Sequence, residues 1–95
     1  MIDLHIHTTN SDGSYKPEEI LEKCEELGLE YISITDHDTC RSYNDLKKLD
    51  ISKIYSGKII TGCEITTTYK GRTIEILGYE IDTNIINEWM KRYYT

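Results

Sequence analysis

Residues 1–13 read MIDLHIHTTNSDG, and this stretch decides the predicted architecture. Apolar side chains at every second position give it the period of two that is typical of a β-strand. They are Ile2, Leu4 and Ile6, and the residues between and after them are Asp3, His5 and His7. Because residues i and i+2 of a strand point to the same face, His5 and His7 should project together. The turn signal Ser-Asp-Gly that follows predicts a loop, which places Asp12 just beyond the strand.

The rest of the chain alternates between helical and strand patterns. Residues 16–28 predict a helix, with Pro17 in its first turn and Gly28 as its stop. The other expected elements are strands over 31–35, 58–65 and 73–81, a helix near 42–49, and a last helix over 85–93 with Asn84 as its cap. A turn at 69–72 indicates that the last two strands form a hairpin. This order predicts an α/β protein with a mainly parallel sheet.

Composition limits the classes of function. The 95 residues suit one domain, and the net charge of -6 argues against sequence-independent binding to nucleic-acid backbones. The three cysteines are odd in number and form no CxxC, which is typical of reduced thiols in a cytoplasmic protein. No signal peptide and no apolar run near the roughly 20 residues of a membrane span are present, so we expect no membrane partner.

Histidines and carboxylates recur at the carboxyl ends of the predicted strands. His5 and His7 end the first strand, His37 follows the second in Thr35–Thr39, and Glu64 ends the third in Gly62–Ile65. The carboxyl ends of parallel strands meet at one rim, where ligands of such proteins gather. Imidazole and carboxylate together suit Zn, Mn or Fe. The pattern therefore predicts a metal site at this rim.

Each of these residues also has a structural interpretation. Two histidines on a strand are often surface residues, Asp12 could form an Asx turn, and Glu64 could be an edge-strand acid. Asp36 and Asp38 could cap the helix that follows them. A metal site accounts for all the positions together, whereas each structural interpretation accounts for one.

Three motifs of the chain resemble a known family. DLHIHTTNSDG at 3–13, ITDHDT at 34–39 and GCEI at 62–65 are similar, in order and spacing, to the first motifs of the PHP (polymerase and histidinol phosphatase) domain. The likeness extends from Ile2 to about Asp82 and includes ILGYEID at 76–82. The SDG form is more similar to stand-alone metal-dependent phosphoesterases, including nucleoside bisphosphatase types, than to the polymerase-embedded domains. The resemblance implies the N-terminal portion of a distorted (β/α)7 barrel.

The resemblance also implies roles for residues. His5 and His7 would bind one metal, Glu64 would bridge two, and Asp12 and His37 would hold a third. A complete site would carry two or three divalent ions, Mn, Zn or Fe, and would hydrolyse a phosphate ester by metal-activated water that attacks phosphorus in line. The flanking aspartates of the second motif would orient His37 or cap a helix.

Two departures from the family pattern stand out. Glu75 occupies a position where family members commonly carry a histidine ligand; it either replaces that ligand or is a solvated strand residue. A whole PHP domain is also much longer, so we expect 1–95 to be a truncated N-terminal portion. An incomplete barrel leaves a sheet edge unpaired, which predicts a homo-oligomer through that edge.

Three functions remain open at this point. The first is a phosphoesterase for a small phosphorylated substrate, active alone or when completed by missing sequence or a partner chain. The second is a non-catalytic metal-binding or assembly domain that retains part of the site. The third, a polymerase module, is disfavoured by the acidic charge and the SDG motif. Lys16 and Arg72 are either phosphate contacts or surface charges.

Overall fold

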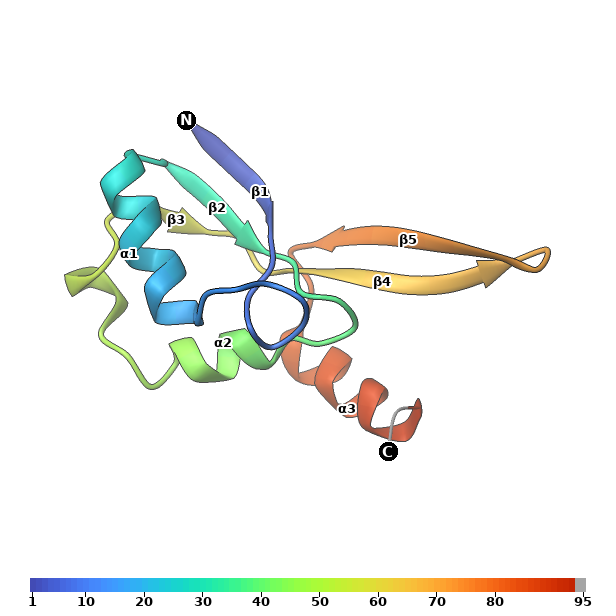
Figure 1. Ribbon diagram of the computed structural model, residues 1–95. Coiled ribbons are helices and arrows are strands. Elements are labelled where there is room, and N and C mark those ends of the chain that lie inside the picture. Colours follow the sequence, from blue (N-terminus) through green and yellow to red (C-terminus); the bar gives the residue numbers. More distant parts are fainter. Residues whose placement is uncertain (94–95) are drawn as a thin grey trace.

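The computed structural model describes residues 1–93 and places a short parallel sheet beside a long antiparallel hairpin (Figure 1). The parallel sheet has the order β1-β2-β3, with β1 at Ile2–Ile6, β2 at Tyr31–Ile34 and β3 at Lys58–Ile59. The hairpin consists of β4, Gly62–Tyr69, and β5, Arg72–Tyr79. The helices are α1 at Pro17–Leu27, α2 at Arg41–Leu46, the 3-10 helix η1 at Ile51–Lys53, and α3 at Thr83–Tyr93. The predicted α/β class and parallel sheet are confirmed.

The strand expected over 58–65 is divided into two. Its first part pairs with β2 in parallel, and the amide of Ile60 still donates to the carbonyl of Ile32 at 2.8 Å. From Gly62 onward the chain pairs instead with β5, in antiparallel register from Gly62↔Tyr79 to Tyr69↔Arg72. Glu64 therefore lies near the start of β4, not at the end of a parallel strand. An antiparallel partner only two residues away in sequence explains this change of pairing.

The helix ends follow local hydrogen bonding. The amide of Lys16 donates to Glu19 Oε1 at 3.1 Å ahead of α1, and Gly28 ends this helix with a left-handed φ of 67°. Asp82 caps α3, because its Oδ1 accepts the amides of Asn84 at 3.0 Å and Ile85 at 3.1 Å. The prediction of Asn84 as the cap is wrong, since a carboxylate two residues earlier supplies the acceptor. No helix among the described residues is long and apolar enough to cross a membrane.

The core lies between β2 and the helices. Ile32 and Ile34 of β2 are buried together with Leu21 of α1 and Tyr43 of α2. The hydroxyl of Tyr43 donates to the carbonyl of Ile34 at 2.6 Å and accepts from the amide of Gly62 at 2.9 Å. One side chain of α2 thus joins the end of β2 to the start of β4.

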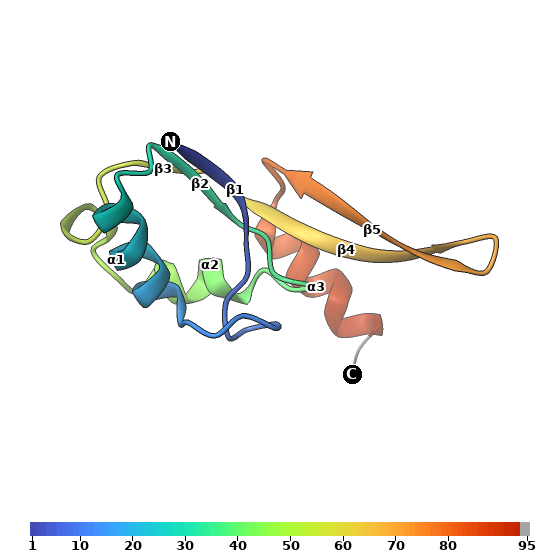
Figure 2. The ribbon, with the colours of Figure 1, turned by 45° about the horizontal axis from the view of Figure 1, so that its top comes forward.

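The hairpin β4–β5 extends away from the rest of the molecule (Figures 1 and 2). Its turn, Lys70–Gly71, has φ values of 50° and 76°, as a two-residue loop that matches the twist of a hairpin requires. The predicted hairpin is confirmed. Along β5, Ile74 and Ile76 are exposed, so this strand carries apolar surface.

Candidate metal centre

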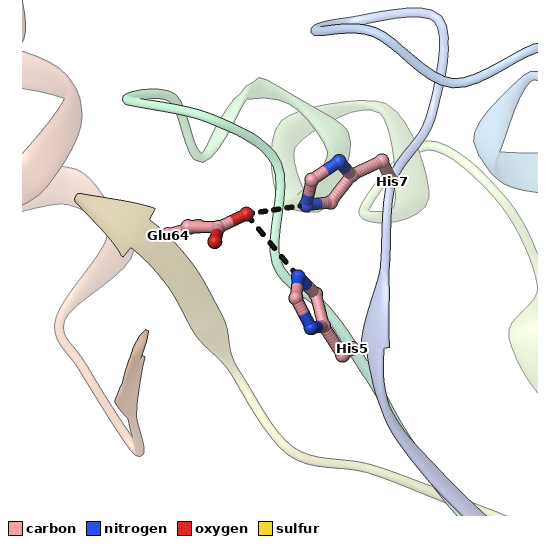
Figure 3. Close-up of side chains that lie close together, drawn as sticks. All are labelled: His5, His7 and Glu64. Atoms are coloured by element: carbon pink, nitrogen blue, oxygen red, sulfur yellow. Dashed lines mark hydrogen bonds and ion pairs between the residues drawn. The ribbon is translucent and has the colours of Figure 1, made fainter. Parts of the chain in front are cut away.

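Two histidines of the β1 segment converge on one carboxylate of β4 (Figure 3). Glu64 Oε1 lies 3.2 Å from His5 Nε2 and 2.8 Å from His7 Nε2. The pairing of β1 with β2 shifts register between Asp3 and Ile6, an irregularity of the kind that re-aims side chains near functional sites. The prediction that His5 and His7 share a face agrees with their contact with the same oxygen.

The hydrogen positions of His7 bear on whether a metal fits this site. His7 Nδ1 lies 2.5 Å from Asp12 Oδ1, and because an ionised carboxylate only accepts, Nδ1 carries the hydrogen. In the neutral ring, Nε2 is then the nitrogen with the lone pair. It is buried, makes no hydrogen bond, and faces Glu64 Oε1 at 2.8 Å. Two electron-pair donors this close need a proton or a metal cation between them, and this set of imidazole and carboxylate ligands fits a divalent metal.

Asp12 joins His7 to the third histidine. Its second oxygen, Oδ2, lies 3.2 Å from His37 Nε2, and the rings of His7 and His37 are 4.4 Å apart between centroids. Asp12 is therefore placed to hold the tautomer of His7 through one oxygen and to ligate through the other. It is exposed, and its observed partners are these histidines and the hydroxyl of Ser11.

Glu75 enters the cluster from β5. In the hairpin register Glu64 lies opposite Leu77, so Glu75 is its diagonal neighbour on the same face. Glu75 Oε1 lies 3.9 Å from His37 Nδ1, and the side chain is half exposed. The structure thus brings Glu75 to the cluster at the position where the family pattern leads one to expect a histidine.

Within residues 1–93, three overlapping groups have ligand atoms within 4.8 Å of one another. They are His5, His7 and Glu64; His7, Asp12 and His37; and His37, Glu64 and Glu75. All six residues predicted from the sequence are therefore brought together. The groups overlap at His7, His37 and Glu64, and of these Glu64, with its two carboxylate oxygens, is the ligand that two neighbouring ions would share.

Two carboxyl groups of the cluster have lowered pKa values. Desolvation raises the pKa of Asp12, but the hydrogen bond from His7 and the charges of His7 and His37 outweigh it and hold that pKa below its ordinary value. Desolvation likewise raises the pKa of Glu64, and hydrogen bonds with His5 and Glu75 outweigh it. Both groups are therefore carboxylates, the form that binds a cation, at neutral pH.

Of the two roles expected for the aspartates flanking His37, the structure contradicts the helix cap. Neither caps α2, whose first residues follow Cys40, so that prediction is wrong. Asp36 instead accepts four hydrogen bonds in the interior. Asp38 has a left-handed φ of 52° and accepts the amide of Thr66 at 2.8 Å, which joins the segment after β2 to β4.

The backbone around His37 and Glu64 is also paired. The amide of Glu64 donates to the carbonyl of Asp36 at 3.0 Å, and the amide of Asp38 donates to the carbonyl of Glu64 at 2.9 Å. His37 and Glu64 therefore face each other across a parallel bridge. A sequence pattern gives no signal for such an isolated bridge.

The two candidate phosphate contacts lie outside this cluster. Arg72 pairs with Tyr69 beside the turn, five residues from Leu77, the partner of Glu64. At the usual rise of a strand this separation is about 16 Å. Lys16 precedes α1. Both therefore fit the interpretation as surface charges.

Gly13 closes the loop that carries Asp12, and we expect Gly13→Ala to disturb it. A Cβ there would overlap the backbone of His7 and Thr8, which cannot move as a flexible side chain can. Overpacking of this kind costs about 1–3 kcal/mol. We expect a loss of unfolding free energy in that range, measured in urea, together with weaker Mn²⁺ binding. Gly71→Ala is the control for a strained substitution away from the cluster, because its φ of 76° disfavours alanine although a Cβ there meets open space. Equal metal binding by the two variants would contradict this prediction.

Comparison with known proteins agrees with the geometry. The PHP domain family model matches residues 3–94. The chain belongs to the PHP domain family. The resemblance seen in the three motifs is therefore confirmed.

Individual relatives cover most of this chain but only a part of their own. The 5'-3' exoribonuclease Rnm of Escherichia coli is 39% identical over 83 residues, which cover 84% of this chain and 27% of the relative. Phosphoribosyl 1,2-cyclic phosphate 1,2-diphosphodiesterase of Eggerthella lenta is 32% identical over 82 residues, covering 84% and 30%. The chain thus spans less than a third of the length of these two relatives.

A solved structure shows the same fold. An amidohydrolase from Chromobacterium violaceum superposes with a TM-score of 0.82 at 24% identity. The superposition covers 96% of this chain and 32% of that protein. The sheet, helices and hairpin described above are therefore those of a part of a larger fold.

Proposed function

We propose that this chain carries the metal centre of a metal-dependent phosphoesterase. The observation that carries the proposal is the lone pair of His7 Nε2 facing Glu64 Oε1 at 2.8 Å inside a cluster of three histidines and three carboxylates. Membership of the PHP domain family, and relatives named for cleaving phosphate esters, support it. We further propose that residues 1–95 correspond to the N-terminal portion of a PHP barrel.

The ligand roles follow from the three groups. His5, His7 and Glu64 would hold one ion, with His7 ligating through Nε2. Asp12 Oδ2 and His37 would hold a second ion. Glu64 and Glu75 would contribute carboxylate oxygens to a third. The mixed imidazole and carboxylate set suits Mn, Zn or Fe. When bound, such ions supply Lewis-acid chemistry that acidifies water and offsets charge on a phosphoryl group.

The residues of the chain have separate tasks in this reaction. Asp12 keeps the hydrogen of His7 on Nδ1, so that Nε2 stays available as a ligand. Backbone hydrogen bonds join Glu64 to Asp36 and to Asp38, and they hold His37 against Glu64. Positioned ligands of this kind, rather than a nucleophilic side chain, would supply the catalytic geometry.

The substrate class that we propose is a small phosphorylated molecule. The relative in Eggerthella lenta is named for a phosphoribosyl cyclic phosphate, and the relative in Escherichia coli is named for RNA. A phosphate ester is common to both. The net charge of -6 disfavours a long nucleic-acid strand, which keeps the small substrate as our proposal.

An assay of ester hydrolysis tests the proposal. The protein, loaded in turn with Mn²⁺, Zn²⁺ and Fe²⁺, is incubated with bis(p-nitrophenyl) phosphate and p-nitrophenyl phosphate. We expect hydrolysis that a chelator abolishes and added metal restores. Tight metal binding without hydrolysis of either ester would contradict a phosphoesterase and favour the alternative, a non-catalytic metal-binding or assembly domain.

We also propose that the protein forms a homo-oligomer through an open sheet edge. The outer strand β5 carries the exposed apolar residues Ile74 and Ile76, and an unpaired apolar edge favours association. Light scattering coupled to size exclusion should give a mass of two chains or more, and Ile76→Lys should lower it. A monomer at concentrations of about 100 µM, far above those at which a dimer of standard interface size dissociates, would contradict the proposal.

A cytoplasmic location completes the proposal. Cys24, Cys40 and Cys63 are all buried free thiols, as a reducing compartment would maintain. Fractionation of cells that express the tagged protein would test this location.

A further inference from the structure

Asp36 is a buried carboxylate that is not among the six candidate metal ligands. Its exposure is 1%, and both oxygens are fully occupied by hydrogen bonds. Oδ1 accepts the amide of Thr8 at 2.6 Å and the hydroxyl of Ser11 at 2.8 Å. Oδ2 accepts the hydroxyl of Thr8 at 2.9 Å and that of Ser42 at 2.6 Å. A buried carboxylate is stable only when its acceptors are satisfied in this way, so the four donors are fixed around it.

Three of the four donors come from the segment between two candidate ligands. Thr8 follows His7, and Ser11 precedes Asp12. Asp36 therefore accepts hydrogen bonds from both ends of the loop that joins His7 to Asp12. The loop is closed on itself as well, since the carbonyl of Thr8 accepts the amides of Ser11 at 3.1 Å and Gly13 at 2.8 Å.

The same loop is tied to α2. Asn10 Nδ2 donates to Ser42 Oγ at 2.9 Å and to Asp45 Oδ2 at 3.0 Å. Ser42 in turn donates to Asp36. The interior of the network thus links the loop, the segment after β2 and the helix α2, while the carboxylate of Asp12 projects from the loop into a mostly exposed position.

The candidate metal ligands differ in the backbone structure that fixes their positions. His5 belongs to β1 and Glu64 to β4, so their backbones are fixed by strand pairing. Asp12 lies in a loop, and apart from its own contacts with the histidines its position depends on the network around Asp36. Loss of that network would therefore displace Asp12 while leaving His5 and Glu64 in place.

We propose that Asp36 is a positioning residue that sets Asp12 against His7 and His37, and that it controls the metal ion held by Asp12 and His37 more strongly than the ion at His5, His7 and Glu64. This inference rests on the proposed metal centre, to which it adds a division into two sites held by different parts of the fold. Outer partners of metal ligands typically control affinity by about 10- to 100-fold.

Metal titration of single-hydroxyl variants tests the inference. Ser11→Ala removes one donor to Asp36 and also a long contact of 3.5 Å to Asp12, and Ser11→Thr keeps both. Ser42→Ala removes a donor to Asp36 from α2, away from Asp12, and should have the same effect. Ser52→Ala is the matched control, because the hydroxyl of Ser52 donates to Asp50 at 2.8 Å far along the chain, on an exposed segment. Mn²⁺ is titrated into each protein and the free ion is followed by electron paramagnetic resonance.

We expect two classes of Mn²⁺ site in the wild type. Ser11→Ala should weaken one class by about 10-fold or more and weaken the other clearly less, whereas Ser11→Thr and Ser52→Ala should resemble the wild type. Equal weakening of both classes, or no weakening of either, would overturn the inference.

A second measurement does not depend on metal. In the metal-free protein we expect the amide of Thr8 to exchange slowly with solvent and Asp36→Asn to speed that exchange by about 10-fold or more, as loss of a hydrogen bond to a charged group predicts. The amide of Ile32, in the core strand, serves as the internal reference for global opening. Unchanged Thr8 exchange would overturn the role of Asp36. Absence of any Mn²⁺ binding by the wild type would instead contradict the proposed function, with the exchange result still deciding whether Asp36 holds the loop.

Discussion

Replacement of Glu64 by glutamine is expected to remove bound metal almost completely. Glu64 Oε1 lies within 3.6 Å of a nitrogen of each of the three histidines, and Glu64 belongs to two of the three ligand groups. The amide keeps the size of the side chain but removes its charge. We expect metal affinity to fall by more than the roughly 10- to 100-fold that loss of an outer partner costs, because the lost group is a ligand itself.

The measurement is isothermal titration with Zn²⁺ and Mn²⁺. Glu26→Gln on the exposed face of α1 is the control, since it removes the same charge from the net charge of -6 without touching the cluster. Wild-type affinity in Glu64→Gln would contradict a bridging role. Loss of affinity in both variants would mean that long-range charge, not ligation, determines binding.

Replacement of Tyr43 by phenylalanine is expected to cost about 2–3 kcal/mol of unfolding free energy. The hydroxyl serves two buried backbone groups, the carbonyl of Ile34 and the amide of Gly62, and each loses its partner in the variant. A buried group left without a hydrogen bond costs about 1–3 kcal/mol. Urea denaturation measures the change, and Tyr69→Phe at the exposed end of the hairpin is the matched control.

The loss of unfolding free energy in Tyr43→Phe should also depend on pH, in a direction that the pKa of Tyr43 determines. Burial raises the pKa of Tyr43 from 10.0 to about 12. A pKa that is higher in the folded state adds stability that is fully present below pH 10 and is lost as the pH rises through 12. The difference in unfolding free energy between the wild type and Tyr43→Phe should therefore be constant below pH 10 and should shrink between pH 10 and 12. A difference that is independent of pH over that window would contradict this account.

The sequence predicted which side chains lie together better than it predicted the strands. His5 and His7 were recognised from their spacing, and the other ligands from their places after predicted strands. Both signals depend on local periodicity, which neighbouring residues in the sequence show directly. The break between β3 and β4 depends instead on competition between two pairing partners, β2 and β5, which no local pattern reveals. Asn84 and Asp82 are both good caps, and only the structure shows which one accepts the first free amides.

Asp36 was the residue whose role could least be predicted. Its neighbours in sequence indicate a helix cap, whereas its actual donors are Thr8 and Ser11 of the loop after β1 and Ser42 of α2. The helix α2 begins at Arg41, five residues after Asp36, which is too far for Asp36 to cap it. The donors themselves are hydroxyl residues of separate segments, which a single sequence does not connect.

Metal content per chain tests the central claim most directly. The wild type and the double variant His5→Ala/His7→Ala are purified without added metal and analysed by elemental analysis, with circular dichroism to show that both are folded. The account predicts Mn, Fe or Zn in the wild type at about one equivalent or more and its loss in the folded double variant. A wild type that holds no metal and binds none on titration would contradict the account.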